Sequence, residues 1–328
     1  MMRIAIIGAG ISGITLARAL TEKTHVTLFE KSRGVSGRLS TRYAAPFCFD
    51  HGADSFTVRT QEFEAFLKPY LENGVVAEWS GKVIDCHLGK KVTQRLWGEK
   101  HLVASPHMNS LCKKLAENLD IKLNTEVAPL SQRQRDGWHL LDKGGVSLGV
   151  YDMVISTAPL AQTLCLLAGH LPNNTPLHYA HMHGCYSVMI GFNRPWKHQW
   201  IAAKVVDHPI QWVSINSTKP GRNKDVTSIV AYSCNKWADA HIDEDITHVQ
   251  NLLLEQFQQV MGIDCTHMDY ISTHRWKYAI VRETTEQSGY YMDTLKGLGC
   301  VSDWSSTSRI EECFLNATQL AKYIIGSP

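Results

Sequence analysis

The chain has 328 residues, of which 44% are hydrophobic and 20% are charged, a composition that excludes a disordered protein and allows two domains. Its 33 basic and 31 acidic side chains give a net charge of +2 without any long Lys/Arg block, so neither nucleic acid nor an anionic membrane is indicated as a partner. No apolar run approaches the length of a membrane span.

The cysteines and histidines narrow the class of protein further. Nine dispersed cysteines without a C-x-x-C pair indicate reduced thiols and therefore predict a cytoplasmic location. None of the 16 histidines has the spacing of a zinc site, so no metal is predicted.

A strand, a glycine motif, a helix and a second strand open the chain. Residues 3–7 are apolar and β-branched, residues 14–20 predict a helix, and residues 25–30 predict the second strand. The turn between the first strand and the helix contains Gly8, Gly10, Ile11, Ser12 and Gly13. In this order, these elements are typical of a dinucleotide-binding βαβ unit.

Each part of this unit has a physical role. Gly8 allows the tight turn, Gly10 lets the backbone approach a pyrophosphate, and Gly13 lets the helix and strand pack closely. The start of the helix offers free N–H groups and a positive dipole end to the phosphates. Glu30, at the end of the second strand, can accept hydrogen bonds from ribose hydroxyls. The unit by itself fits either NAD or FAD.

The segment that follows Glu30 favours FAD. Residues 30–42 are glycine-rich and include Lys31, Arg33, Gly37, Arg38, Leu39 and Arg42. An NAD site needs no such segment after its acidic residue, whereas a longer ligand has a second part to hold. The planar guanidinium of Arg38 suits a phosphate or carbonyl oxygen. A solvated basic loop is the competing interpretation.

The middle of the chain alternates between the two predicted structural types. Residues 61–73 and 105–119 predict helices, the second with Ser105 as its N-cap. Residues 121–130 and 152–159 predict strands. Further strands are expected at residues 186–192, 210–215 and 227–232, and a long helix at residues 243–261.

The C-terminal region predicts a strand followed by a helix. Residues 297–304 form the short strand, which ends near Asp303, and the apolar stripe after it predicts a helix. Ser308 and Glu311 have the spacing of a capping box, which would place the helix start at Ser308.

Two groups of residues together resemble a known family. Residues 30–38 and 50–57 are similar to the FAD-binding start of the flavin amine-oxidase superfamily and, more narrowly, of the bacterial renalases. Four later segments extend the resemblance to about residue 323, namely residues 151–159, 215–222, 274–279 and 301–317.

The resemblance implies an α/β fold in which a Rossmann-type FAD-binding domain carries an inserted α+β substrate domain built on an antiparallel sheet. We expect residues 1–60, 98–160 and 285–328 in the discontinuous FAD-binding domain, and residues 61–97 and 161–284 in the substrate domain. FAD is then a resident cofactor that O2 reoxidises.

The resemblance also implies further cofactor contacts. The aspartate at position 303 would bind near the ribityl phosphate, and the following helix would direct its positive end at the flavin pyrimidine, where reduced flavin is negative. Val127 would hold the adenine through backbone contacts. The complete implied set adds Gly52, Ala53, Asp54, Ser55, Phe56, Thr57, Arg309 and Ile310 to the residues above.

The substrate contacts are predicted from side-chain chemistry. Flat tryptophan side chains would suit a nicotinamide ring, and Lys219 and Arg222 would suit an anionic dinucleotide tail, with a rigid exposed turn as the competing interpretation. The predicted set is Cys185, Trp212, Lys219, Arg222, Trp276 and Arg309.

Four positions depart from the family pattern. Asp54 and Ser55 stand where the family has Gln and Tyr against the flavin, and Ser302 and Glu312 stand where it commonly has Gly. Backbone contacts dominate at residues 52–57, so FAD binding is expected to survive these departures, while the choice of substrate is open.

The predicted function is an FAD-dependent oxidase that takes a hydride from a 2- or 6-dihydronicotinamide dinucleotide and releases NAD(P)+ and H2O2. Such a donor becomes aromatic, so the protein mainly has to position it. The alternatives are a flavin amine oxidase or desaturase of the same fold, a flavin-binding protein without catalysis, and an NAD-dependent dehydrogenase.

Overall fold

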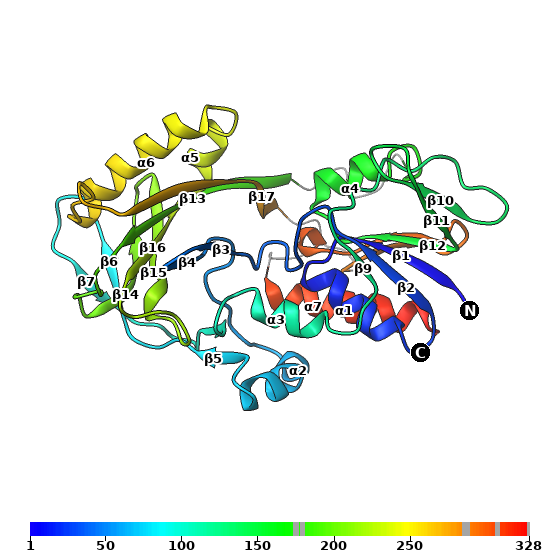
Figure 1. Cartoon of the computed structure of the whole chain (residues 1–328), viewed down its shortest axis with the longest axis horizontal. Helices are drawn as coiled ribbons and strands as arrows, with labels where there is room; N and C mark the ends of the chain where they lie inside the picture. The colour runs from blue at the N-terminus through cyan, green and yellow to red at the C-terminus, as the bar shows by residue number, and fades with distance from the viewer. Residues whose placement is uncertain (173–176, 178–180, 284–288, 306–308, 327–328) are drawn as a thin grey trace.

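A computed structural model describes residues 1–328 except 173–176, 178–180, 284–288, 306–308 and 327–328. Two lobes lie side by side, each built on its own sheet, and the chain passes between them several times (Figure 1).

The first sheet has six strands in the order β18-β19-β12-β1-β2-β9. All neighbours are parallel except β18 and β19. The strands are β1 (Arg3–Ile7), β2 (His25–Phe29), β9 (Ile121–Lys122), β12 (Met153–Ser156), β18 (Tyr291–Asp293) and β19 (Leu298–Cys300). β1 lies at the centre and is buried on both faces, as its continuous apolar sequence predicts.

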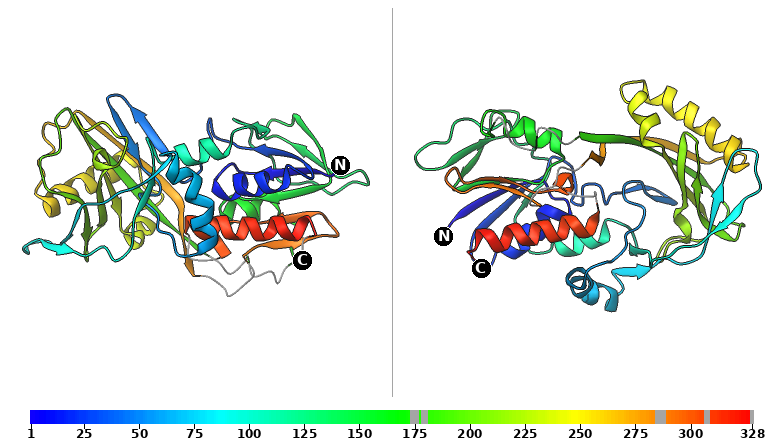
Figure 2. Two further views of the ribbon diagram at one scale, coloured as in Figure 1. Left: turned by 90° about the horizontal axis from the view of Figure 1, so that it is seen from below. Right: turned by 180° about the vertical axis from the view of Figure 1, so that it is seen from behind.

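Four helices share one core beneath this sheet. They are α1 (Ile11–Leu20), α2 (Gln61–Glu72), α3 (Ser110–Leu115) and α7 (Ile310–Ile324). Figure 2 shows α1 and α7 running beside each other along the sheet. Phe63 and Leu67 of α2 are buried in this core, although the sequence analysis placed residues 61–97 in the other domain. Only β6 and β7 of that segment join the second sheet.

The opposite face of the six-stranded sheet has a separate covering. It consists of the hairpin β10 (Trp138–Leu141) and β11 (Ser147–Tyr151) with α4 (Leu160–Leu166). The six-stranded sheet therefore lies between two layers, as in a doubly wound α/β domain.

The second sheet has seven strands in the order β17-β13-β16-β15-β14-β6-β7. They are β6 (Lys82–Cys86), β7 (Thr93–Arg95), β13 (His181–Phe192), β14 (Trp200–Val205), β15 (Ile210–Ile215), β16 (Thr227–Ser233) and β17 (Tyr270–Glu283). All pairs are antiparallel except β14 with β6. Strands β13 and β17 are long and reach toward the first lobe (Figure 1).

One face of the second sheet carries α5 (Asn235–Ala240) and α6 (Ile246–Met261). The side chain of Asp245 caps α6 by accepting from the N–H groups of Thr247 and His248, and Gly262 ends it in the left-handed conformation. Val249, Leu253 and Phe257 of α6 are fully buried, which confirms the helical stripe expected at residues 243–261.

The other face of this sheet is covered by a hairpin that comes from the first lobe. Its strands are β3 (Thr41–Ala44) and β4 (Phe47–Asp50), and Phe47 and Phe49 pack against β13, β16 and β17. Smaller elements complete the fold: β5 (Val76–Glu78), β8 (Leu102–Ala104), and the 3-10 turns η2 (Asn216–Thr218) and η3 (Asp303–Ser305).

Three expected elements differ from the structure. The strand expected at residues 297–304 is only β19, and residues 303–305 form η3. The helix expected from Ser105 begins at Ser110, because the N–H of Met108 donates to the carboxylate of Asp50 and the preceding turn is drawn onto the β3–β4 hairpin. The strand expected at residues 121–130 is only the two-residue β9, and Val127 makes an isolated bridge with Asp142.

Candidate active site

The turn between β1 and α1 has the geometry of a phosphate-binding loop. Gly10 is the N-cap of α1, no side chain caps the helix, and its first turn holds no acidic residue. The carboxylate of Glu30 accepts from the N–H of Ala9 at 2.9 Å and of Ser32 at 2.8 Å. Each of its oxygens retains a lone pair with which it can accept a ribose hydroxyl. These residues therefore fit the ADP half of FAD.

The glycines of this turn differ in the space around them. A Cβ at Gly13 would lie 2.1 Å from the Gly8 carbonyl oxygen, whereas a Cβ at Gly10 would meet nothing within 4 Å. Gly13 is thus required by the packing of the protein itself. The open space at Gly10, beside the uncapped start of α1, fits a ligand phosphate.

This difference predicts separable effects for two alanine variants. Gly13→Ala is expected to destabilise the apoprotein, because its methyl group collides with the backbone. Gly10→Ala, at an ordinary φ of −78°, is expected to leave the apoprotein as stable as the wild type and to lower its flavin content. Urea unfolding of the apoproteins and the flavin absorbance per protein measure both effects; equal loss of stability in the two variants would contradict the assignment.

Arg38 connects the first lobe to the second. Its guanidinium makes a bidentate ion pair with the buried Asp303, at 2.6 Å for each bond, and donates to the carbonyls of Tyr278 and Ala279 on β17. A phosphate or carbonyl oxygen was the expected ligand of Arg38, and the carbonyls that Arg38 contacts belong to the protein itself. The backbone carbonyl oxygen of Arg38 accepts from the N–H of Ala53, and a Cβ at Gly52 would lie 1.9 Å from that oxygen.

The start of α7 lies beside α2. Arg309 is the N-cap of α7 and makes no side-chain cap, and Ile310, its first residue, packs against the core of the first lobe. Glu311 is buried, and its carboxylate accepts from the N–H groups of Arg59 and Thr60 and from the Thr60 hydroxyl. Glu311 thus stabilises the start of α2; Ser308, its expected capping partner, lies outside the described residues.

Asp54 and Ser55, the two departures nearest the expected flavin, are both paired. A carboxylate oxygen of Asp54 accepts from Trp212 Nε1 at 2.8 Å, and the other lies 2.8 Å from Lys219 Nζ. The hydroxyl of Ser55 lies 3.1 Å from Nδ1 of His101, whose ring stacks on Trp97. His101 and Trp97 were not among the predicted site residues, because no sequence motif links residues 97–101 to residue 55.

Lys219 and Arg222 are buried, so the exposed turn that competed with their substrate role is wrong. Lys219 is 0% exposed and Arg222 7% exposed. Both contact the Asp50 carboxylate, at 3.4 and 2.5 Å, and Lys219 also contacts Asp54. Burial would raise the pKa of Asp50, but these two cations lower it to about 2. The ion pairs use the charges that were expected to hold a dinucleotide tail, which corrects that prediction.

Three predicted substrate residues do come together. Cys185, Trp212 and Trp276 belong to one cluster on the sheet face that carries the β3–β4 hairpin. Trp276 Nε1 donates to the carbonyl of His51, the residue before Gly52. The rings of His51 and Trp276 are stacked 5.4 Å apart. Burial raises the pKa of the Cys185 thiol to about 12, so this cysteine contributes packing rather than a nucleophile.

Arg42 introduces an unpaired charge beside this cluster. Its partner across the hairpin is Phe49, and its Nε is buried without a hydrogen-bond partner. Among the described residues no ion pair or hydrogen bond of the Arg42 guanidinium is found. Its charge acts on His51 and His274, which lie next to each other. The basic segment 30–42 pointed to Arg42 only as one cation among four.

His51 and His274 predict an acid-sensitive fold. Burial and the neighbouring positive groups lower the pKa of each from about 6.5 to about 4. Between these values the unfolded chain binds protons that the folded chain does not, so the free energy of unfolding should fall as the pH drops from about 6.5 toward about 4. Urea unfolding at a series of pH values gives the free energy of unfolding as a function of pH. This pH dependence should be weaker in His274→Gln than in the wild type; an unchanged pH dependence would contradict the assignment.

The other predicted cofactor residues differ in their burial and backbone conformation. Ile11, Ser12 and Leu39 are buried, Gly37 has a φ of +54°, and Phe56 pairs with Leu102. Lys31 is exposed, Thr57 is half-buried, and Val127 is buried. Direct contacts of these residues with FAD stay predictions.

Within the part of the chain that the structure describes, no group of histidine, cysteine or acidic side chains is arranged to hold a metal ion. None of the helices described is both long and apolar enough to span a bilayer.

Residues 6–70 match the NAD(P)-binding Rossmann-like domain, and residues 85–319 match the flavin containing amine oxidoreductases. A curated relative, the 4,4'-diapophytoene desaturase (4,4'-diaponeurosporene-forming) of Staphylococcus aureus strain MRSA252, is 33% identical over 78 residues. That match covers 20% of this chain and only 16% of the desaturase.

Solved structures of low sequence identity share the whole fold. One, named "Putative protoporphyrinogen oxidase", from Exiguobacterium sp. 255-15, superposes with a TM-score of 0.80 at 14% identity and covers 100% of this chain and 99% of its own. A putrescine oxidase triple mutant gives 0.76 at 12% identity, with the same coverage. An oxidoreductase from Methanosarcina mazei gives 0.71 at 12%, covering 98% of this chain and 100% of its own.

Proposed function

Because this chain belongs to the flavin containing amine oxidoreductases and its cofactor is FAD, we propose that it is an oxidase that takes a hydride from 2- or 6-dihydronicotinamide dinucleotides. Bound FAD would supply the acceptor for the hydride, and its reoxidation by O2 with one further proton from solvent would give H2O2. The organic product is NAD+ or NADP+, which is aromatic, so no protein group has to remove a proton from the substrate carbon.

The observation that carries this proposal is the unpaired guanidinium of Arg42. Asp54 bonds to Trp212 of the cluster and Asp50, through its backbone carbonyl, to Tyr232, and both carboxylates are paired with the buried cations Lys219 and Arg222. The uncompensated charge there is positive. Such a site favours an anionic substrate and opposes a cationic amine. A nicotinamide dinucleotide has the required negative charge in its pyrophosphate.

The tryptophan side chains supply the second requirement, which is a flat apolar surface for the ring. Trp276 is fixed by its bond to the carbonyl of His51, and Trp212 by its bond to Asp54, at 2.9 and 2.8 Å. Anchored rings lose little entropy when a planar ligand stacks on them. Asp54, in the family position of Gln, thus acts on the substrate through Trp212.

The same rings also support a second candidate, the oxidation of an uncharged amine, because an aromatic surface would accept one. A steady-state comparison separates the two. FAD-loaded protein should release H2O2 with the mixed dihydronicotinamide isomers and not with a panel of primary, secondary and tertiary amines. Peroxide release with amines alone would replace the proposed function by amine oxidation.

A further inference from the structure

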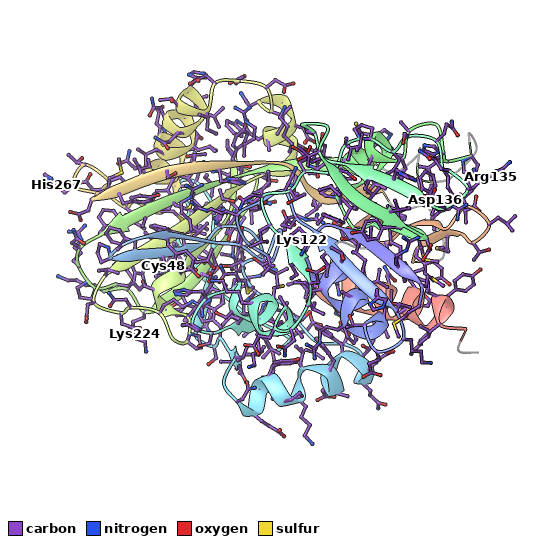
Figure 3. All side chains as sticks on the ribbon, turned by 45° about the vertical axis from the view of Figure 1, so that its right-hand side comes forward. Cys48, Lys122, Arg135, Asp136, Lys224 and His267 are labelled. Carbon is purple, nitrogen blue, oxygen red and sulfur yellow. The ribbon has the colours of Figure 1, made fainter. Side chains whose placement is uncertain are left out.

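A cavity lies in the substrate lobe, apart from the residues assigned to FAD. It has a volume of about 230 Å³ and lies between the β3–β4 hairpin, the turn before α3 and the segment after η2. Exposed Pro46, Gly221 and Asn223 line its outer side. Figure 3 shows Cys48, another lining residue, on β4 in the left-hand lobe, and Lys122 of the first sheet well to its right.

Two nitrogen atoms at this cavity are buried without a partner. One is Nε of Arg222, whose side chain is 2% exposed, and the other is Nδ1 of His107. The terminal nitrogens of Arg222 bond to Asp50 and to the carbonyls of Ala104 and Pro220, whereas Nε–H has no acceptor. A buried donor without an acceptor is costly, and native proteins satisfy it with a solvent molecule or a ligand.

The rest of the lining combines two hydroxyl groups, of Ser217 and Ser228, with apolar side chains such as Pro46 and Val226. Ser217 Oγ accepts from the N–H of Ser228, so its own O–H remains a donor, and Ser228 contributes a second hydroxyl. No carboxylate lines the cavity; Asp50 contacts Arg222 from outside the lining. Arg222 and Lys113 both act electrostatically on His107, and Asp50 opposes them; of the two cations only Arg222 lines the cavity. Donors with a small positive excess are suited to a singly charged oxyanion.

We propose that this cavity binds a small monocarboxylate, held by Arg222 Nε–H, the Ser217 and Ser228 hydroxyls and the His107 imidazole. Its volume amounts to several water molecules, each of which occupies about 30 Å³ in the liquid, so a carboxylate with a short chain fits and a nucleotide does not. Burial lowers the pKa of His107, which keeps the ring neutral at pH 7 and able to donate from Nδ1.

The cavity is linked to the candidate active site by a chain of side-chain contacts. Asp50 joins Arg222 to Lys219, and Lys219 contacts Asp54, which in turn binds Trp212. An anion bound at Arg222 is therefore connected to the proposed substrate surface through this network of ion pairs. The binding claim itself does not depend on the proposed function, since it needs no turnover.

The test is a saturation-transfer NMR titration of the FAD-loaded protein with acetate, and with acetamide as the uncharged probe of the same shape. Acetate should bind saturably with a dissociation constant on the order of 1 mM, as expected for so small a ligand. Acetamide should bind at least about tenfold more weakly, because charge-assisted hydrogen bonds are the stronger ones.

Matched histidine variants locate the site. His107→Phe keeps the edge contact with Tyr43 and should weaken acetate about tenfold, roughly the loss of one hydrogen bond to a charged group. His208→Phe removes another histidine that has a buried unpartnered nitrogen but lies outside the cavity, and should bind acetate like the wild type. Equal binding by the two variants, no saturable binding at all, or equal affinity for acetate and acetamide would overturn the proposal.

Discussion

Replacing Asp50 by asparagine is expected to lower the free energy of unfolding by about 3–5 kcal/mol, because the change leaves the buried Arg222 without its counter-ion and Lys219 with Asp54 alone. Lys219 is fully buried, and the Arg222 side chain is 2% exposed. The Asp50 carboxylate also accepts from Thr41 and from the N–H of Met108, so one side chain joins the hairpin, the turn before α3 and the segment after η2. Chemical denaturation at pH 7 measures the loss.

Two controls make this prediction specific to the buried network. Asp85→Asn breaks an ion pair with Arg95 that is 43% exposed on the arginine side, and should cost at most about 1 kcal/mol. The pKa of Asp50 is lowered to about 2 by Lys219 and Arg222 against its burial, so its contribution is present above the unfolded value of about 4 and is lost as the pH falls toward about 2. A loss at pH 7 no larger for Asp50→Asn than for Asp85→Asn would contradict the assignment.

The second large effect is expected at Arg42. Arg42→Gln should raise KM for a dihydronicotinamide dinucleotide by about 10- to 100-fold, equivalent to one or two charge-assisted hydrogen bonds, with a smaller effect on kcat. Arg42→Lys keeps the charge and should recover much of the affinity. Steady-state kinetics at several salt concentrations measure both variants, and the salt dependence of KM should be weaker in Arg42→Gln.

A matched cation separates a local effect from a loss of general charge. Arg33, in the same basic segment, is exposed, and Arg33→Gln should leave KM nearly unchanged. If Arg42→Gln and Arg33→Gln raised KM equally, the site at Arg42 would be excluded. If Arg42→Gln improved the oxidation of a cationic amine, the positive charge of the native site would be confirmed, and a cation would be excluded as its natural substrate.

The parts of the fold that the sequence predicted well are those encoded by neighbouring residues. The apolar run of β1, the glycine turn and Glu30 follow each other within a short stretch, and the structure places them as expected. The apolar stripe of α6 is equally local. Periodicity depends on residues a few positions apart, which is why it can be interpreted without the tertiary structure.

The predictions fail where a residue far away in the sequence determines the local structure or pairs with a charged side chain. Asp50 binds the N–H of Met108, 58 positions away, and shortens the helix expected from Ser105. The same carboxylate binds Arg222, 172 positions away, and converts an expected ligand group into part of a buried network. Glu311 similarly accepts a hydrogen bond from the N–H of Thr60, the N-cap of α2. No spacing rule connects such positions, so only the folded chain shows that these charges are already paired.

The most direct test of the proposed function is the anaerobic reduction of the bound FAD by separated 2-, 4- and 6-dihydronicotinamide dinucleotides, followed at the flavin absorbance in a stopped-flow instrument. We expect the 2- or the 6-isomer to bleach the flavin within its first turnover and the 4-isomer to do so far more slowly. If none of the three isomers bleached the bound flavin faster than it reduces free FAD, the proposed function would be wrong.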